Sequence, residues 1–226
     1  MPLILNIETS TTLCSVALAE AGEVVSVKEI NEGYTHAENL HVFIEEVLEK
    51  TGKSVKDLNA IAVGSGPGSY TGLRIGVSAA KGLAYALQIP LISVNTLQIM
   101  AAVAIQKVKS DVLFCPMLDA RRMEVYTALF DKDLNTIKET TAKILPEDLS
   151  FFTTGKAIAF FGDGMLKCKE ILSQIPQSSF IDDVVPLSGA LAQLSFQKYG
   201  KKQFEDVAYF EPFYLKDFLI NKPKGN

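Results

Sequence analysis

The chain has 226 residues, of which 48% are apolar and 21% are charged, which suffices for one large domain or two small ones with real cores. The formal net charge of −4 argues against a strong autonomous nucleic-acid binder, which would need clustered Lys and Arg. The N-terminus lacks a signal-peptide pattern, no apolar run is long enough to span a membrane, and the 3 cysteines are far apart. These features predict a reduced, cytoplasmic protein with no membrane segment.

The first half predicts three strands joined by short turns, then a helix, a strand, a glycine-rich loop with a second helix, a strand and a third helix. Thr35 and Glu38 have the spacing of a capping box at the start of the first helix. The order βββαβαβα indicates a mixed sheet with helices packed on it. The expected strands are 3–8, 13–19, 23–30, 59–64 and 90–94, and the later helices run over 77–87 and 96–108.

The second half predicts a similar order of elements. Placing Glu8 on Asp119 aligns residues 16–19 with residues 127–130, which is a faint internal repeat. We therefore expect two domains, 1–108 and 109–226. The expected strands are 112–119, 124–130, 136–144 and 157–161, and the expected helices are 165–175 and 188–199.

The glycine-rich loop over residues 64–76 joins an apolar strand to a helix. Its glycines bring bare backbone close to something, which is either a phosphate at the helix N-terminus or another stretch of backbone. No Gly-Lys-Ser/Thr follows the glycines, and their spacing does not fit a dinucleotide fingerprint. The loop alone therefore does not identify a ligand.

An ordered set of short motifs spans nearly the whole chain, and together they resemble the TsaB (YeaZ) family. The resemblance implies an α/β fold of the actin-like ATPase superfamily, with a duplicated RNase H-like domain. It also implies a non-catalytic partner of the enzyme TsaD in making threonylcarbamoyladenosine in tRNA. The motifs lie at residues 4–10, 35–40, 67–74, 80–84, 119–126 and 212–216.

The same resemblance implies the partners. They are a TsaD-like catalytic subunit, a TsaE-like ATPase and, for the isolated chain, a second copy in a homodimer. The 22 basic and 26 acidic residues contain no basic run longer than two, so we expect tRNA to be bound only through the complex. The basic residues that could complete a composite RNA site there are Lys81, Arg121 and Arg122.

Nucleotide and metal chemistry have weak support in the residues. Glu8, Thr9 and Ser10 could form a vestigial first phosphate loop, but the matching segment 119–122 has no glycine. TsaD carries its metal on a His-x-x-x-His pair, and the resemblance places Thr96 and Met100 at those two positions, where neither is a good ligand. We therefore expect no metal, no cofactor and no catalytic residue. The alternative function is an enzyme of the same superfamily, either a peptidase or a small-molecule ATP-dependent kinase.

Two helices carry residues that could contact a partner. In the second helix, small residues recur every four positions, so that stripe packs either on the chain's own sheet or against a partner helix. The first helix has a wide apolar arc, and His36 near its start is expected at a surface or an interface rather than at a metal. The resemblance implies that both helices form the partner interface. The expected interface residues are His36, Leu40, Phe43, Val47, Gly72, Gly76, Ala80 and Ala84.

Overall fold

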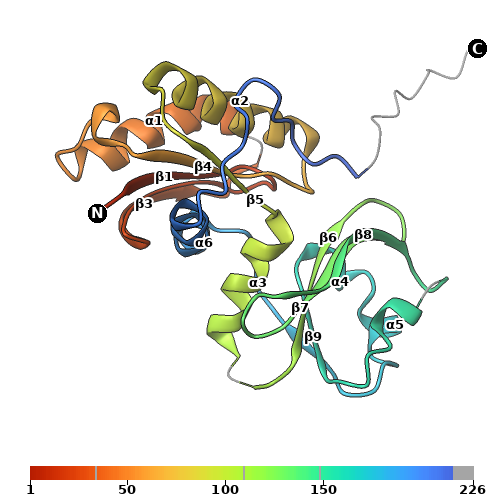
Figure 1. Cartoon of the computed structure of the whole chain (residues 1–226). Helices are drawn as coiled ribbons and strands as arrows, with labels where there is room; N and C mark the ends of the chain where they lie inside the picture. Colours follow the sequence, from red (N-terminus) through yellow and green to blue (C-terminus); the bar gives the residue numbers. More distant parts are fainter. Residues whose placement is uncertain (34, 109, 148, 216–226) are drawn as a thin grey trace, which may run out of the picture.

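The computed structural model describes residues 1–215 apart from residues 34, 109 and 148. Figure 1 shows two lobes, each built on a sheet. Two features named from the sequence fall partly outside the described residues. They are residue 109, at the expected domain boundary, and residue 216, the last of the closing motif. Within the described ranges, no helix has the length and apolar character needed to cross a membrane.

The first sheet has the strand order β3-β2-β1-β4-β5. Its antiparallel part is the predicted meander of β1 (Leu3–Glu8), β2 (Cys14–Glu20) and β3 (Glu23–Ile30). β4 (Ala60–Gly64) lies parallel to β1, and β5 (Leu91–Val94) lies parallel to β4. β1 and β4 are buried along their whole length, which explains their nearly unbroken apolar sequences.

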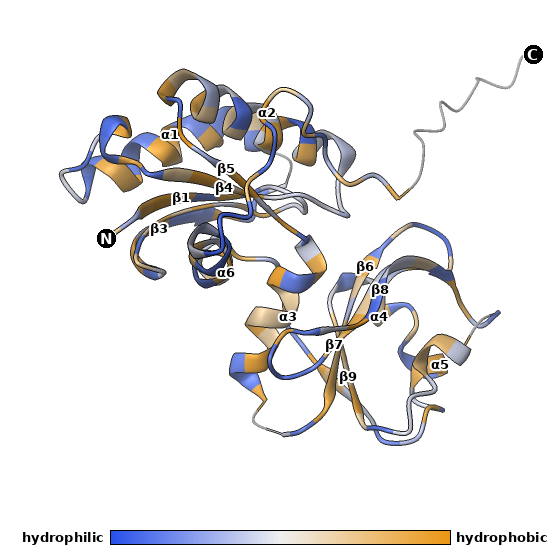
Figure 2. Ribbon diagram, in the orientation of Figure 1, coloured by the Kyte–Doolittle hydropathy of each residue, from blue (hydrophilic) through white to orange (hydrophobic). Residues whose placement is uncertain are grey.

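The second sheet repeats this topology, with the order β10-β9-β6-β7-β8. β6 (Leu113–Asp119), β7 (Glu124–Phe130) and β8 (Thr136–Ile144) form an antiparallel meander, and β9 (Ile158–Phe161) and β10 (Ser178–Ile181) extend it in parallel. β6 thus corresponds to β1, as the faint sequence repeat indicated. The predicted mixed α/β class is confirmed, and most strands of both sheets are hydrophobic in Figure 2.

Helices cover both faces of the first sheet. α1 (His36–Glu49) and α2 (Tyr70–Leu87) pack on one face through a core that includes Leu40, Val47 and Val77. The opposite face is covered by α6 (Ser188–Gly200), whose Leu191 and Leu194 pack against residues of β1, β4 and β5.

The helices that end the two halves are exchanged between the sheets. α3 (Thr96–Lys107) follows β5 but packs its Leu97, Met100 and Ala104 against the second sheet. α6 follows β10 but packs on the first sheet, and α3 also contacts α6. Figure 1 shows α3 between the lobes. The strands of the two sheets lie on either side of residue 108, while each of these two helices covers the sheet of the other half; the division into domains 1–108 and 109–226 stays a prediction.

Two local predictions are wrong, and one strand was not predicted. The helix expected over 165–175 is two short helices, α4 (Asp163–Leu166) and α5 (Lys169–Leu172), which are separated by Lys167 and Cys168. β10 was not predicted, since its order comes from pairing with β9 rather than from an apolar pattern. Thr35 makes no side-chain cap, because its φ of −92° and ψ of 18° are not the extended geometry that a capping residue needs.

Candidate functional site

The candidate site lies at the carboxyl ends of β1 and β4, two neighbouring strands of the first sheet. Because the two strands are parallel, with Ile7 opposite Val63, Glu8 and Gly64 lie at the same end of the sheet. The loop after β1 then runs along the glycine-rich loop. The Ser69 backbone N–H donates to the Ser10 carbonyl over 2.6 Å, and the Thr9 hydroxyl donates to the Gly72 carbonyl over 2.8 Å.

The glycines are needed because the chain itself fills the space where side chains would stand. A Cβ on Gly64 would collide with the Glu8 carboxylate, and a Cβ on Gly68 with the Ser10 carbonyl. Gly72 and Gly76 in α2 lie in the same way against the Thr9 carbonyl and the Thr9 hydroxyl. Of the two explanations that the sequence left open, the close approach of another stretch of backbone accounts for Gly68 and Gly72, whereas Gly64 and Gly76 make room for side chains of the loop after β1.

Glu8, Thr9 and Ser10, the expected vestigial phosphate loop, are all buried. Glu8 Oε1 accepts a 2.7 Å hydrogen bond from the Ser10 backbone N–H. Among the described residues, Glu8 Oε2 and the Ser10 hydroxyl are buried without a hydrogen-bond partner. Burial raises the pKa of Glu8 above its usual 4.5, more than the hydrogen bonds from the backbone N–H groups of Ser10 and Thr9 lower it. The loop therefore disfavours a negative charge at its own carboxylate.

This burial predicts a pH-dependent stability that depends on Glu8. On raising the pH, the unfolded chain loses this proton near its usual pKa, whereas the folded chain keeps it longer. The stabilisation from protonated Glu8 is fully present below the pKa that Glu8 has in the unfolded chain. It is lost as the pH rises through the higher pKa that Glu8 has in the folded chain. Glu8→Gln keeps an acceptor at Oε1 and cannot ionise, so we expect its free energy of unfolding to fall less than that of the wild type as pH rises. Urea unfolding between about pH 5 and 8 measures this. If the free energy of unfolding changed equally with pH in the wild type and in Glu8→Gln, Glu8 would not titrate as described.

The corresponding turn of the second sheet, between β6 and β7, is built differently. It contains no glycine, and Arg121 and Arg122 adopt φ values of 68° and 50° there. Left-handed backbone at non-glycine residues is strained and leaves two bulky side chains at the turn. Both arginines are exposed at this turn.

Asp119, at the end of β6, is held by groups that the sequence analysis did not single out. Lys167 Nζ lies 2.5 Å from Asp119 Oδ1 and also donates to the Glu124 carbonyl. Burial alone would raise the pKa of Asp119, but the hydrogen bonds from Lys167 and from the Arg121 backbone N–H outweigh it and lower that pKa. The acidic group of this turn is therefore already neutralised within the chain. No sequence pattern indicated Lys167, because it lies on the short segment between α4 and α5.

Thr96 and Met100, at the positions expected for metal-binding histidines, are buried and serve packing. The Thr96 hydroxyl accepts a 3.1 Å hydrogen bond from the Gly66 backbone N–H, and Met100 packs in the core between α3 and the second sheet. Across residues 1–215, leaving aside 34, 109 and 148, no cluster of three or more His, Cys, Asp or Glu side chains could hold a metal ion.

All eight residues expected at a partner interface are buried in the chain itself. His36 is buried, and its Nε2 lies 2.8 Å from the Thr11 carbonyl. The other three residues of α1 and the small residues of α2 also face inward, with Ala80 and Ala84 in the core between the helices and the first sheet. The stripe is therefore explained by packing on the chain's own sheet. These residues are Leu40, Phe43, Val47, Gly72, Gly76, Ala80 and Ala84.

A second stripe of α2, which sequence reasoning missed, is the one that faces outward. Arg74, Ser78, Gly82 and Ala86 recur every four residues and are all exposed, and a Cβ on Gly82 would have nothing within 4 Å. The same spacing therefore occurs twice in one helix. The signal that distinguishes the stripes is the pair Leu73 and Val77, whose apolar side chains mark the buried side.

The three candidate RNA residues differ in availability. Arg121 and Arg122 are exposed at the β6–β7 turn. Lys81 is not free, because its Nζ donates to the Phe210 carbonyl over 2.7 Å and to the Ala208 carbonyl over 3.3 Å. Lys81 thus holds the segment after α6 against α2.

Comparison with known sequences gives a family model and named relatives. Residues 32–210 match the model described as TsaD: tRNA N6-adenosine threonylcarbamoyltransferase. The tRNA threonylcarbamoyladenosine biosynthesis protein TsaB of Escherichia coli is 40% identical over 147 residues, which are 64% of this chain and 63% of that protein. TsaB of Bacillus subtilis is 37% identical over 127 residues, 56% of this chain and 54% of that protein. The matches thus span about half to three fifths of these relatives.

Comparison with solved structures agrees. YeaZ from Pseudomonas aeruginosa has a TM-score of 0.82 and 26% identity, and the match covers 95% of this chain and 100% of that one. The activator of 2-hydroxyisocaproyl-CoA dehydratase from Clostridium difficile, solved with bound ADPNP, has a TM-score of 0.51 over 90% of this chain and 98% of that one. Its identity is only 12%, so it supports the actin-like fold alone.

Proposed function

The chain belongs to the TsaB (YeaZ) family, and on that premise we propose that it is a non-catalytic subunit that supports a TsaD-like enzyme. The reaction of that enzyme would be the transfer of a threonylcarbamoyl group to the adenosine next to the anticodon in tRNA. The names of the relatives support the pathway, and the residues of this chain support the accessory role.

One observation carries the accessory role. Thr96 and Met100, where a TsaD-like enzyme would present its metal-binding histidines, are buried and used for packing. A hydroxyl that accepts from the Gly66 backbone and a thioether in an apolar core are poor ligands for zinc or iron. The two loops that would face a nucleotide give further support, since Glu8 is buried and Asp119 is paired with Lys167.

We place the partner contact on the exposed sides of the two helices that cover the first sheet. α2 offers Ser78, Gly82 and Ala86, whose small side chains would let a partner helix approach closely. α1 offers Val42, which is 47% exposed, among exposed acidic residues such as Glu45. The buried residues of the same helices would act indirectly, by fixing the positions of these surfaces.

The remaining partners are inferred from the family alone. They are a TsaE-like ATPase and, when the TsaD-like subunit is absent, a second copy of this chain. We infer that tRNA is contacted through the assembly and that the complex acts in the cytoplasm. Arg121 and Arg122 remain the residues of this chain that could add to such an RNA surface.

The isolated chain tests the accessory role against the alternative of a peptidase or a small-molecule kinase. We expect it to retain less than about a tenth of an equivalent of zinc or iron after chelation. We also expect no peptide cleavage, and ATP hydrolysis far below the roughly 1 per second at the low end of enzyme turnover. Elemental analysis and a coupled ATPase assay measure these quantities. One tightly held equivalent of metal, or turnover at an enzyme-like rate, would favour the alternative.

A further inference from the structure

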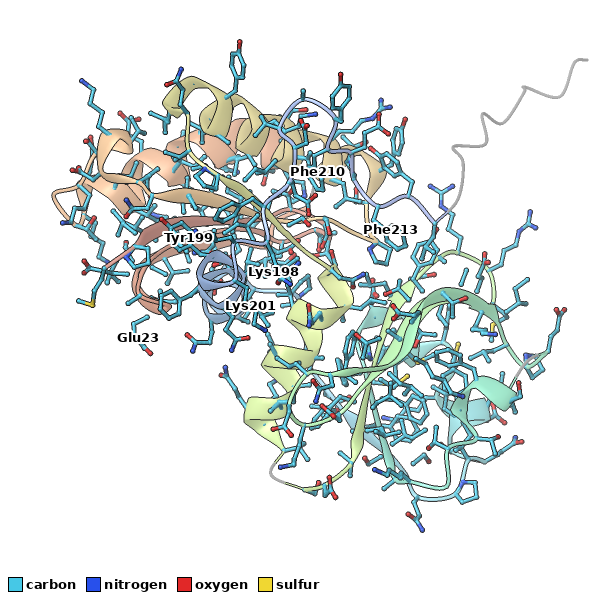
Figure 3. The ribbon with its side chains drawn as sticks, viewed as in Figure 1. Glu23, Lys198, Tyr199, Lys201, Phe210 and Phe213 are labelled. Atoms are coloured by element: carbon cyan, nitrogen blue, oxygen red, sulfur yellow. The ribbon has the colours of Figure 1, made fainter. Side chains whose placement is uncertain are left out.

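The segment after α6 returns across the first lobe to the glycine-rich loop. The Glu205 backbone N–H donates to the Leu91 carbonyl at the edge of β5, and Val207 and Phe210 pack against the core beneath α2. Figure 1 shows this segment crossing α2, and Figure 3 labels Phe210 and Phe213 along it. We call residues 205–214 the C-terminal strap.

The strap ends on the glycine-rich loop. The Phe213 backbone N–H donates to the Ser65 carbonyl over 2.7 Å, and a Cβ on Gly66 would lie 2.8 Å from the Phe213 carbonyl. The hydrogen bonds of Glu205 and Phe213 thus hold the two ends of the strap, and Lys81 holds its middle. Its last side chains therefore stand in defined positions on the surface.

At this end the strap completes a cluster of side chains with the first turns of α2, in which the rings of Tyr70 and Tyr214 are tilted by 42°. The rings of Tyr214 and Tyr70 have centroids 5.1 Å apart, and the Arg74 guanidinium lies 4.1 Å from the centre of the Tyr70 ring. Phe213 and Tyr214 remain 43% and 37% exposed, and Arg74 is exposed as well. We call Tyr70, Arg74, Phe213 and Tyr214 the aromatic corner.

We propose that the aromatic corner is the energetic centre of the contact with the TsaD-like subunit, an inference that rests on the proposed function. Tyr, Phe and Arg are enriched at protein interfaces, and Tyr and Arg dominate their binding energy. Here the strap orders these side chains before binding, so little conformational entropy remains to be lost. Arg74 also begins the exposed small-residue stripe of α2, so the corner and the stripe form one continuous surface.

The charge around the corner favours a protein over a nucleic acid. Phosphate binding needs clustered cations, and among the four residues of the corner, all of which the structure describes, Arg74 is the single cation. The nearest lysine of α2, Lys81, is committed to strap carbonyls. The adjoining Glu211 is exposed and acidic, which would repel a phosphate backbone. The complementary partner surface therefore presents an apolar pocket for the rings and a carboxylate for Arg74.

The test measures the affinity of purified variants for the TsaD-like subunit of the same organism. We expect Tyr214→Ala and Arg74→Ala each to raise the Kd about tenfold or more. Tyr209→Ala is the matched control, because Tyr209 lies on the same strap, is 84% exposed and does not belong to the aromatic corner. We expect it to change the Kd by less than about twofold. Circular dichroism and amide exchange of residues 65–72 verify that each variant keeps its fold. If Tyr214→Ala loosens the strap, the Kd of Arg74→Ala alone tests whether the corner contributes to binding, because Arg74 lies on α2 and its replacement leaves the strap backbone unchanged.

The outcomes separate this inference from the proposed function. If the wild-type chain does not bind the TsaD-like subunit at all, the proposed function fails and the inference falls with it. If the wild type binds and both corner variants bind equally well, the proposed function stands and the inference is overturned. It is also overturned if the variants keep their affinity for the subunit while the assembled complex loses tRNA binding, since the corner would then be a stacking surface for bases.

Discussion

Replacing Gly72 by alanine is expected to lower the free energy of unfolding by about 2–4 kcal/mol. The new methyl group would collide with the Thr9 carbonyl, a backbone atom that cannot swing aside. Overpacking of this kind costs about 1–3 kcal/mol. The displacement would also strain the hydrogen bond from the Thr9 hydroxyl to the Gly72 carbonyl, which contributes about 1 kcal/mol.

Gly82→Ala is the matched control, because it makes the same substitution in the same helix. A Cβ at Gly82 would meet no atom within 4 Å, so only helix propensity changes. We expect the free energy of unfolding to rise by about 0.5–1 kcal/mol. Urea or guanidinium titrations of both variants measure the difference. Equal effects at the two positions would show that the loop after β1 does not pack against α2 as described.

The contrast between these glycines shows where sequence reasoning stopped. The spacing of small residues in α2 indicated a closely packed helix face, and that much is confirmed for Gly72, Gly76, Ala80 and Ala84. It did not say what lies against the face, because a sheet of the same chain and a foreign helix need the same small residues. The exposed stripe at Ser78, Gly82 and Ala86 was overlooked because it has the same four-residue spacing as the buried one.

Most of the fold could be predicted, because periodicity and turn residues act locally. The two meanders, the order of the strands along the chain and the repeat that places Glu8 on Asp119 all follow from short-range patterns. The exchange of α3 and α6 between the sheets did not. A helix of either half shows an apolar face, and its sequence does not specify which sheet buries that face.

The candidate site was harder to predict because its parts are far apart in sequence. The buried state of Glu8 depends on Gly64 and on the loop before α2, and the pairing of Asp119 depends on Lys167. The aromatic corner joins Tyr70 to Tyr214, two residues from separate motifs of the family resemblance. Side-chain chemistry suggested Glu8 and Asp119 in the sequence, but Lys167 and the contact between Tyr70 and Tyr214 are seen only in the fold.

The second large effect is expected for Gly82→Arg, which should abolish association with the TsaD-like subunit while the chain stays folded. Gly82 is exposed in the middle of the small-residue stripe, so an arginine there fits the free chain. In a close helix contact the same side chain would hold the helices apart or leave a buried charge without a partner. Gly200→Arg is the control, since Gly200 is an exposed glycine at the end of α6 with no atom near its Cβ position. Sedimentation of each variant with the subunit measures association. Normal binding by Gly82→Arg would move the interface away from α2.

We propose that this chain does no chemistry and yet is needed by the enzyme that does. The direct measurement is the amount of threonylcarbamoyladenosine formed in tRNA when the TsaD-like subunit, the TsaE-like ATPase and a threonylcarbamoyl donor are combined with and without this chain. We predict product only when the chain is present, no product from the chain without the TsaD-like subunit, and loss of product with Gly82→Arg but not with Gly200→Arg. Product formed by this chain in the absence of the TsaD-like subunit, or an undiminished yield when the chain is left out, would contradict the account.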